Sequence, residues 1–287
     1  MSQPASVSVI IVTYNSSATI AESLRAVRPS EQSQVLETIV VDNNSSDGTL
    51  VQITGEFPEI KTIANRRNLG FACGCNVGAD AAQGEYLLFL NPDLMPDKGA
   101  VEQLLMAMKT RPKVGAATGR LRYASGDFQA NCRHFPTISN LLFSRGSAIG
   151  RLLLNRLFPN SGYYTLPDYA DVTEVPAVAG TMMLVRRDLF KLAGGFDRRY
   201  FIYMEDTDLC LRLDMSGYKN LFVPQAGAVH GFGKGSSAGK FIRTWHHHQS
   251  LWRYFLKHYP NGFSLILLPV LLSVHLVFVC LLPERKV

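Results

Sequence analysis

The 287-residue chain has few cysteines, and their spacing is uninformative as a motif. There are five thiols, none of them in a C-x-x-C pair, at Cys73, Cys75, Cys132, Cys210 and Cys280. An odd number without such spacing favours reduced thiols in a cytosolic compartment. A signal peptide is also missing, because Met1 leads through a short polar stretch straight into the first apolar run. We therefore expect the catalytic part of the chain to stay in the cytosol.

The chain also lacks the glycine-rich signatures of common nucleotide-binding loops. No segment reads G-x-x-x-x-G-K-[ST], and no G-x-G-x-x-G follows the first apolar run, so the dinucleotide-binding interpretation lacks its fingerprint. The formal charge of +6 and the pI near 9.1 arise from scattered basic residues, and no recognised nucleic-acid motif is present. We expect no nucleic-acid partner, and an anionic membrane fits the positive charge better.

Short apolar and β-branched runs, separated by helix-like stretches, are what the chain does contain. They are Val7 to Val12, Glu37 to Val41 and Tyr86 to Leu90. Such runs are typical of strands buried on both faces of a parallel sheet. Helices are predicted after each of these runs. The first starts at Ser16 or Ser17 and ends at Ala26, the second starts at Ser46 or Asp47 and ends at about Glu56, and the third starts at Asp97 and ends at Lys109. The sequence predicts an α/β fold with a Rossmann-like, mostly parallel central sheet flanked by helices.

Polar residues follow each of the three runs. They are Thr13, Tyr14 and Asn15 after the first, Asp42 to Asn44 after the second, and Asn91-Pro92-Asp93 after the third. Ligands of open α/β sheets bind at the carboxyl ends of the strands. Asp42 can accept hydrogen bonds from a ribose or from the N–H of a pyrimidine, while Thr13 to Asn15 can present backbone groups to the base. Asp93 alone is equally well explained as a turn residue, but the three ends together suit a nucleotide that carries a diphosphate.

A glycine-containing turn between Asn68 and Gly78 leads into another predicted helix. Main-chain N–H groups at such a helix start can approach an anion. The donor-binding candidates in this region are Asn68, Gly70, Phe71 and Asn76.

Six segments of the chain, taken in order, resemble glycosyltransferase family 2, whose members are inverting enzymes with the GT-A fold. Within that family the chain is most similar to rhamnosyltransferase-like and galactofuranosyltransferase-like members. The resemblance covers roughly residues 6 to 258. The segments are VSVIIVTYNSS, IVVDNNSSDGT, NRRNLGFACGCNVG, YLLFLNPD, AGTMMLVRRDLFKLAGGFDRRYFIYMEDTDLCLRL and HGFGKGS, the last beginning at His230.

The resemblance implies a metal site. Asn91-Pro92-Asp93 stands at the family's D-x-D motif, with Asp93 as the carboxylate that meets a divalent metal bridging the two donor phosphates. Mg²⁺ or Mn²⁺ would stabilise the charge on the departing nucleoside diphosphate. Asn91 replaces the first carboxylate, so we expect the metal to be held with donor bound. A lone histidine is more often structural, but in similar enzymes the residue at His230 is a metal ligand, and imidazole favours Mn²⁺.

The resemblance also implies a general base in Glu205-Asp206-Thr207-Asp208, which opens a predicted helix reaching Gly217. Acidic residues in a first helical turn are favoured by the helix dipole without any function. The family's E-D-x-D motif nevertheless places its base in this acidic pair. We assign the base to Asp206, with Glu205 beside it and Asp208 as a supporting or acceptor-binding residue.

Two further candidates follow from the same resemblance. Gly180 is expected near the donor sugar and the acceptor. The glycine-rich loop from Gly231 to Gly239, which carries Lys234, is expected to act as a mobile lid over the diphosphate. The stretch from about Arg120 to Asp171 has weak periodicity and is interpreted as an acceptor-side insertion.

The composition changes at the C-terminus. Phe263 to Leu282 carries no formal charge and is long enough to span a bilayer, but Pro269 and His275 interrupt it, so a kinked or in-plane hairpin is an alternative. Lys240 to His258 mixes aromatic and basic residues like an interfacial helix, with His246 to His248 on its polar face. We predict a GT-A catalytic domain over 1–239, with a nucleotide-binding half 1–118 and an acceptor and catalytic half 119–239, followed by a membrane-associated helical segment over 240–287.

The sequence therefore predicts an inverting, metal-dependent transferase that moves a sugar from a nucleoside diphosphate donor, with dTDP-L-rhamnose favoured, to a lipid-linked (polyprenyl diphosphate) saccharide. The expected location is the cytoplasmic face of the plasma membrane, in cell-surface polysaccharide synthesis. Another donor (UDP-galactofuranose, a UDP-hexose or GDP-mannose) or a soluble acceptor stays open. The competing class is a non-catalytic membrane-associated nucleotide-sugar-binding protein. The Asn91 departure is the only hint of it, and the retention of Asp93, Asp206 and His230 argues against it.

Overall fold

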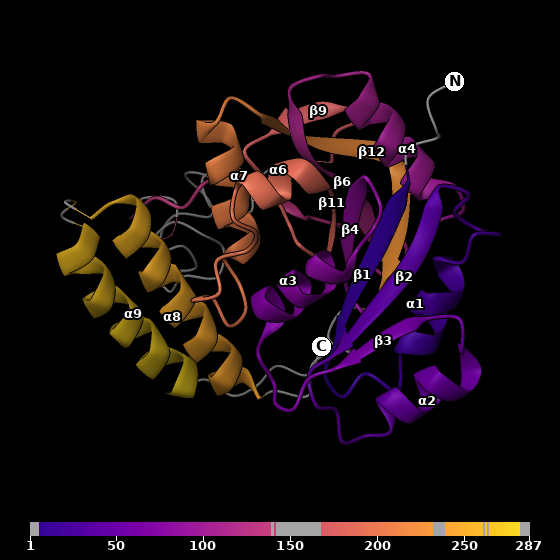
Figure 1. Ribbon diagram of the computed structural model, residues 1–287. Helices are drawn as coiled ribbons and strands as arrows, with labels where there is room; N and C mark the ends of the chain where they lie inside the picture. Colours follow the sequence, from indigo (N-terminus) through magenta and orange to yellow (C-terminus); the bar gives the residue numbers. More distant parts are fainter. Residues whose placement is uncertain are drawn as a thin grey trace.

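The computed structural model describes residues 6–138, 141, 168–231, 239–260, 262 and 264–281. In the first part of the chain, strands and helices alternate (Figure 1): β1 (Val7–Thr13), α1 (Ile20–Ala26), β2 (Val35–Asp42), α2 (Thr49–Glu56), β3 (Lys61–Ala64), α3 (Phe71–Ala81), β4 (Tyr86–Leu90), β5 (Leu94–Pro96) and α4 (Ala100–Lys109). The second part contains β6 (Val114–Arg122), β7 (Phe128–Gln129), β8 (Cys132–Arg133), β9 (Thr173–Val175), β10 (Ala177–Val178), β11 (Met182–Arg186), α6 (Arg187–Leu192), α7 (Glu205–Met215), β12 (Lys219–His230), α8 (Lys240–His258) and α9 (Ser264–Leu281).

One mixed sheet forms the centre of the molecule, in the strand order β3-β2-β1-β4-β11-β6-β12-β5. β3, β2, β1 and β4 run parallel to one another, and β6 and β12 form a second parallel pair. β11 is antiparallel to both of its neighbours, β4 and β6, and so joins the two parallel halves. The far end of β12 pairs with β5, which places His230 opposite Leu94. The predicted α/β fold with a mostly parallel sheet is confirmed.

Helices cover both faces of the sheet, as continuous apolar strands require. Every residue of β1 and β4 is buried. Alternate side chains of β1 enter two separate cores, with Val9 and Ile11 facing α1, α2 and α4, and Ile10 and Val12 facing α3, α6 and α7. The sheet is therefore the middle layer of a three-layer arrangement (Figure 1).

The predicted helix ends at Ala26, Glu56 and Lys109 are confirmed, whereas the predicted starts are not. The helices begin at Ile20, Thr49 and Ala100, after Thr19, Gly48 and Gly99, and none of these preceding residues caps its helix through a side chain. Asp47, which was predicted as a cap, does bind the start of its helix. Its carboxylate accepts hydrogen bonds from the N–H of Thr49, the first residue of α2, and from the N–H of Ser17.

α8 and α9 lie side by side as a helical hairpin, beyond α7 (Figure 1). The side chains of Leu251, Tyr254 and Phe255 on α8 belong to the same core as α3 and α7. Part of α8 therefore packs into the same core as α3 and α7. Of the helices that the structure describes, none is long and apolar enough to cross a bilayer.

Candidate functional site

The carboxyl ends of β1 and β2 are joined by side-chain hydrogen bonds. Thr13 lies opposite Asp42 in the sheet, and its hydroxyl donates to Oδ1 of Asp42 at 3.0 Å. Ser45 donates to the same carboxylate through its N–H (2.9 Å to Oδ2) and its hydroxyl (2.5 Å to Oδ1). Asn15 accepts from the N–H of Ser46 at 2.8 Å. Tyr14 projects from this edge with 44% of its surface exposed.

Left-handed backbone conformations mark the same edge. Among the described residues, non-glycine residues with positive φ are Asn15 (52°), Asn44 (67°), Tyr203 (69°) and Met204 (71°). The asparagines follow β1 and β2, and the other pair immediately precedes Glu205 at the start of α7. Such strain costs of order 1–3 kcal/mol per residue and is concentrated at functional sites, where the surrounding structure maintains it. These φ angles therefore fall at the strand ends and at the α7 start, where the candidate site residues also lie.

The turn before α3 is locked to the aromatic loop that leads to α7. A Cβ on Gly70 would lie 2.2 Å from the carbonyl oxygen of Phe201, so only glycine fits there. The N–H of Gly70 donates to Oδ1 of Asn68 at 2.9 Å, and the N–H of Phe71 donates to the Phe201 carbonyl at 2.7 Å. Both of these N–H groups are therefore used internally and do not face an anion in this conformation.

Asn76 is also a structural residue. Its Nδ2 donates to the Phe196 carbonyl at 2.8 Å, and its Oδ1 accepts from the Phe196 N–H at 2.9 Å. The side chain is 6% exposed. Both ends of the amide are therefore committed to holding the Phe196 loop against α3, which contradicts its predicted role in donor binding.

The predicted metal ligands, Asp93 and His230, meet at the junction of β5 and β12. His230 Nε2 lies 3.2 Å from Oδ1 of Asp93, and the N–H of Gly231 donates to the Asp93 carbonyl at 2.8 Å. The other ring nitrogen, Nδ1, lies 2.9 Å from Oε1 of Gln129 on β7. An amide oxygen only accepts, so Nδ1 donates to Gln129, and Nε2 is left facing Asp93. This pairing suits two ligands of one cation.

Asp93 and His230 are the two candidate metal ligands that the structure brings together here. In the chain as far as it is described, no group of three or more His, Cys, Asp or Glu side chains could hold a metal ion. Asn91 is part of the same loop, where its N–H donates to the Thr181 carbonyl at 3.0 Å. That hydrogen bond sets the Asp93 loop beside Gly180.

Asp206 lies at the start of α7, only 5% exposed. Its Oδ2 accepts from Nη2 of Arg133 and from the N–H of Gly180, each at 2.8 Å. Its Oδ1 accepts from the N–H of Thr207 at 2.6 Å and from the Thr207 hydroxyl at 3.1 Å. A Cβ on Gly180 would meet the Phe71 ring at 3.3 Å and Asp206 at 3.5 Å. Gly180 therefore lies close to both the Phe71 ring and Asp206.

Glu205 differs from its neighbour in its surroundings. It is 3% exposed, and its Oε2 has no hydrogen-bond partner among the described residues. Burial, followed by the negative charge of Asp206, raises the pKa of Glu205 well above its usual value. Because the protonated carboxyl is favoured, Glu205 is a poorer general base than Asp206, whose charge Arg133 compensates.

Asp208 is fully buried and belongs to an ion-pair network. Its carboxylate lies 2.8 Å from Arg212 Nη2, 2.7 Å from Lys257 Nζ and 2.7 Å from His258 Nε2. Burial acts to raise the pKa of Asp208, but the hydrogen bond from His258 and the charges of Arg212 and Lys257 outweigh it and lower the pKa. Asp208 therefore joins α8 to α7 and is not open to an acceptor, so of its two predicted roles, supporting or acceptor-binding, only the supporting one fits.

We expect Asp208→Asn to lower the unfolding free energy by about 3–5 kcal/mol near neutral pH, because it leaves buried cations without their partner. The folded-state pKa is lowered, so this contribution is present above the unfolded value of about 3.9 and is lost as the pH falls through the folded value. Urea unfolding at decreasing pH should therefore show the variant and the parent converging in acid. Asp214→Asn, which breaks the exposed pair with Lys219, is the control and should change little. An equal effect of the two substitutions would contradict this account.

α8 also braces the aromatic loop in front of Asp206. The ring of His246 stacks on Phe201 with centroids 4.6 Å apart, and His247 packs on Tyr203 at 5.6 Å. Burial, then the positive charges of Arg133 and His275, lowers the pKa of His247 to about 4. His248 is 7% exposed and bonds to His275 of α9 at 2.9 Å. The predicted polar histidine face is wrong, because these rings fill the contact between α8, α9 and the loop.

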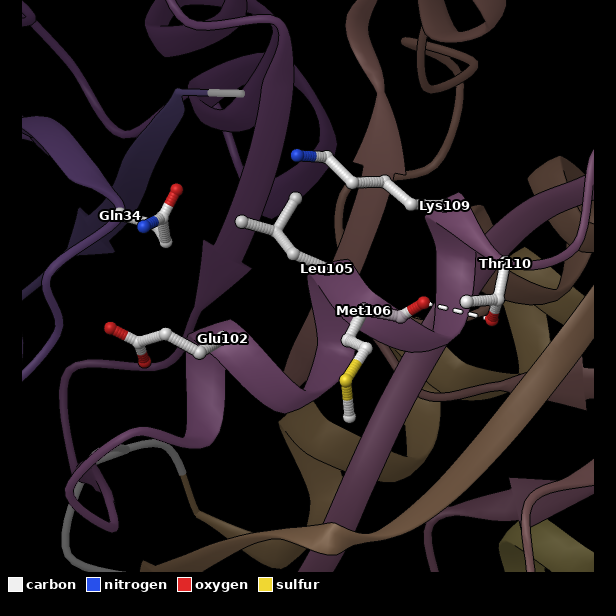
Figure 2. A pocket seen from close by; sticks show the side chains of 6 residues that line it. All are labelled: Gln34, Glu102, Leu105, Met106, Lys109 and Thr110. Carbon is white, nitrogen blue, oxygen red and sulfur yellow. Dashed lines mark hydrogen bonds between the residues drawn. The ribbon is translucent and has the colours of Figure 1, made fainter. Parts of the chain in front are cut away.

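A hollow elsewhere on the surface is unrelated to this site (Figure 2). It is lined by Gln34, Glu102, Leu105, Met106, Lys109 and Thr110. Gln34 directly precedes β2, whereas Asp42 ends it. The hollow therefore lies beside α4 at the opposite end of that strand from the carboxyl edge.

Two residues of the site have no counterpart in the sequence interpretation. Gln129 and Arg133 come from the stretch that was taken as a weakly periodic insertion, and each sits in a strand of only two residues. No local pattern distinguishes them, and only their contacts reveal them. Lys234 and the centre of the predicted lid, residues 232–238, lie outside the described residues.

Comparison with known proteins bears on the family to which the chain is similar. The family model described as "Glycosyl transferase family 2" matches residues 8–193. The N-acetylglucosaminyl-diphospho-decaprenol L-rhamnosyltransferase of Mycobacterium tuberculosis is 28% identical over 77% of this chain and 75% of its own length. Rhamnosyltransferase WbbL of Escherichia coli is 28% identical over 67% of this chain and 72% of its own length.

Solved structures agree on the fold. The mannosyltransferase PcManGT of Pyrobaculum calidifontis, solved with GDP-Man and Mn²⁺, has a TM-score of 0.59 and 18% identity, covering 99% of this chain and 77% of that chain. TarS residues 1–349 of S. aureus, solved with UDP-GlcNAc, has a TM-score of 0.58 and 16% identity, covering 94% of this chain and 71% of that chain. These likenesses support the GT-A fold.

Proposed function

Because the chain belongs to glycosyl transferase family 2, we propose that it is an inverting, metal-dependent glycosyltransferase that moves L-rhamnose from dTDP-L-rhamnose to a lipid-linked saccharide. The observation that carries the proposal is the placement of Asp206. It lies buried at the edge where the carboxyl ends of the strands converge, and Arg133 and the Gly180 N–H hold it in place. One ionised carboxylate in such a setting is what a single displacement needs.

The chemistry assigned to Asp206 is removal of the acceptor hydroxyl proton. As the proton moves to the carboxylate, the acceptor oxygen forms a bond to the anomeric carbon from the face opposite the nucleoside diphosphate, and the bond to the diphosphate breaks. No covalent enzyme intermediate is required. The buried surroundings of Asp206 exclude water and so disfavour hydrolysis of the donor.

Asp93 and His230 would hold the metal. The fit rests on the donor set: one carboxylate oxygen and one imidazole nitrogen that faces it, with the imidazole oriented by Gln129. Mn²⁺ accepts this oxygen and nitrogen combination more readily than Mg²⁺ does. When bound, the ion would neutralise negative charge on the departing diphosphate. Two protein ligands leave coordination positions for phosphate oxygens, in keeping with retention of the metal by donor-bound protein.

The choice of rhamnose is supported by the two curated relatives, both named as rhamnosyltransferases. The lipid-linked acceptor is supported by the name of the M. tuberculosis relative, which acts on a decaprenol-linked diphosphosaccharide. Thr13, Asp42 and the exposed Tyr14 form the proposed nucleoside-binding edge. UDP-galactofuranose, UDP-hexoses and GDP-mannose are the alternative donors.

A donor panel tests the proposed reaction. Membranes that contain the protein are incubated with radiolabelled dTDP-rhamnose, UDP-galactofuranose, UDP-galactose, UDP-N-acetylglucosamine and GDP-mannose, with Mn²⁺ or EDTA, and label is counted in the lipid extract. We expect transfer from dTDP-rhamnose with Mn²⁺ and none with EDTA. Transfer from another donor would overturn the rhamnose assignment. A labelled aqueous product distinct from the donor, with no label in the lipid extract, would overturn the lipid acceptor.

A place at the cytoplasmic membrane surface is part of the proposal, and α9 supplies the contact. Ile266, Val270, Val274 and Val277 recur at helical spacing on one face of α9 and are 59–71% exposed. On α8, Phe241 and Trp245 are about half exposed, and Arg243 is exposed between them. An apolar stripe beside basic residues suits a helix that lies in the plane of an anionic bilayer.

We expect Val270→Asp combined with Val274→Asp to abolish binding to vesicles of anionic phospholipid, because the charges would have to enter the acyl region. Flotation of the protein with such vesicles measures this directly. Leu192→Asp is the matched control, since Leu192 on α6 is 81% exposed but lies outside the hairpin. Equal flotation of the parent and both variants would refute the docking face.

A further inference from the structure

The segment from Phe128 to Arg133 reaches both chemical centres of the site. At one end Gln129 contacts His230, and at the other Arg133 contacts Asp206. β7 pairs with β6 and β8 pairs with β10, so the segment is fixed at both ends by sheet hydrogen bonds. Asn131 lies between them and is 3% exposed.

Asn131 fixes the middle of this segment to the site. Its side-chain Nδ2 donates to the Thr118 hydroxyl at 2.8 Å and to the Gly119 carbonyl at 2.9 Å. The main-chain carbonyl of Asn131 accepts from the Ala179 N–H at 2.8 Å. Ala179 directly precedes Gly180, the residue whose N–H binds Asp206. The segment, the Gly180 turn and the base therefore form one connected unit.

The contacts of Asp206 distinguish its two oxygens. A carboxylate offers about four acceptor positions, and all are used here, two on each oxygen. Oδ2 is held by the Arg133 guanidinium and a backbone N–H. Oδ1 is held by the Thr207 N–H and by the Thr207 hydroxyl, which is the longest of the four contacts at 3.1 Å. The Thr207 hydroxyl can rotate away from Oδ1. An incoming acceptor alcohol needs one such acceptor position on the carboxylate of the base.

We propose that Gln129 and Arg133 are positioning residues of the reaction, and that Oδ1 of Asp206 is the oxygen that takes the proton. Arg133 and Gly180 anchor Oδ2, and an acceptor hydroxyl replaces the Thr207 hydroxyl on Oδ1. Gln129 holds His230 with Nε2 turned to Asp93. One short segment thus contacts both the base and the metal pair and fixes their positions relative to each other. This inference rests on the proposed function.

A double-mutant cycle tests the role of Arg133. We expect Arg133→Met to lower kcat by roughly 100-fold, because a misplaced base loses its alignment, and Arg133→Lys to fall between it and the parent. The KM for the donor should stay within about twofold of the parent value, since the contacts that bind the donor equally in the ground state and the transition state are unchanged. If Arg133 acts through Asp206, Arg133→Met causes no further loss in an Asp206→Asn background.

The variants are chosen so that misfolding does not decide the outcome. Arg133→Met alone leaves Asp206 as a buried, uncompensated charge, whereas Arg133→Met with Asp206→Asn removes both charges and should unfold at nearly the parent temperature. A large rise in donor KM, or a further loss in the double variant, would overturn the positioning role of Arg133. Thr207→Val removes the hydroxyl that the acceptor is proposed to replace, so the KM for the acceptor should fall, and a rise in this KM would overturn the choice of Oδ1.

Mn²⁺ binding gives Gln129 a readout that does not depend on turnover. Electron paramagnetic resonance of Mn²⁺ with dTDP present should show affinity weakened roughly 10- to 100-fold in Gln129→Leu, the usual cost of removing a hydrogen-bond partner from a ligating histidine. Gln103→Leu, on α4, is the control. Unchanged affinity in Gln129→Leu would overturn this inference alone. A parent protein that binds no Mn²⁺ with dTDP or UDP would overturn the proposed metal site and the inference together.

Discussion

Asp206→Asn should remove nearly all sugar transfer and leave donor binding almost unchanged. Loss of a general base typically costs about 10²- to 10⁴-fold in rate. Asparagine keeps the shape of the side chain but cannot take the acceptor proton. Binding of the donor does not involve that proton, so the affinity of the protein for the donor should stay the same. Initial rates with a labelled donor, together with calorimetric titration of the nucleoside diphosphate, measure the two effects separately.

Glu205→Gln and Asp214→Asn are the matched controls for this result. Glutamine resembles the protonated carboxyl that the raised pKa of Glu205 favours, so Glu205→Gln should keep much of the activity. Asp214 is on the same helix but pairs with Lys219 at the surface, and its amide variant should behave like the parent. If Glu205→Gln were the inactive variant and Asp206→Asn the active one, the assignment of the base would be reversed.

His230→Ala should have the second large effect, and the effect should depend on metal. Removal of a metal ligand is expected to cost more than the roughly 10- to 100-fold that follows loss of a ligand's hydrogen-bond partner. Asp93→Asn should act in the same direction, since its carboxylate lies 3.2 Å from the His230 ring. Transfer rates measured over a range of Mn²⁺ concentrations should show half-activation moving to much higher Mn²⁺ in both variants.

Asp80→Asn is the control for the metal variants, because Asp80 is exposed on α3 and contacts neither ligand. EDTA should abolish transfer by the parent and by this control, and added Mn²⁺ should restore it. Full activity of the His230→Ala variant in EDTA would show that transfer needs neither His230 nor a metal.

Strand ends were the part of the site that the sequence could predict. A continuous apolar run fixes a buried strand, and the polar residue after it must then lie at the sheet edge. Thr13, Asp42 and Asp93 were found in this way, and the structure brings each to the expected edge. Asp206 and His230 needed the family motif, because a helix start and a strand end are both common places for such residues.

Side-chain partners could not be predicted in the same way. Asn76 and Asp208 carry polar groups suited to a ligand, yet their hydrogen-bonding capacity is used by Phe196 and by the cations of α7 and α8. Those partners come from residues more than 40 positions away in most cases, such as Lys257 for Asp208. Gln129 and Arg133 were missed for the converse reason, since their strands are too short to carry a periodic signal.

The most direct test of a single displacement by Asp206 is the anomeric configuration of the transferred sugar. The labelled product is isolated from the lipid extract, and its one-bond and vicinal coupling constants are compared with those of the donor sugar by nuclear magnetic resonance. The account predicts a configuration opposite to that of the donor, because the acceptor oxygen attacks from the face away from the diphosphate. A retained configuration would contradict it, since retention is not the outcome of one displacement with one general base.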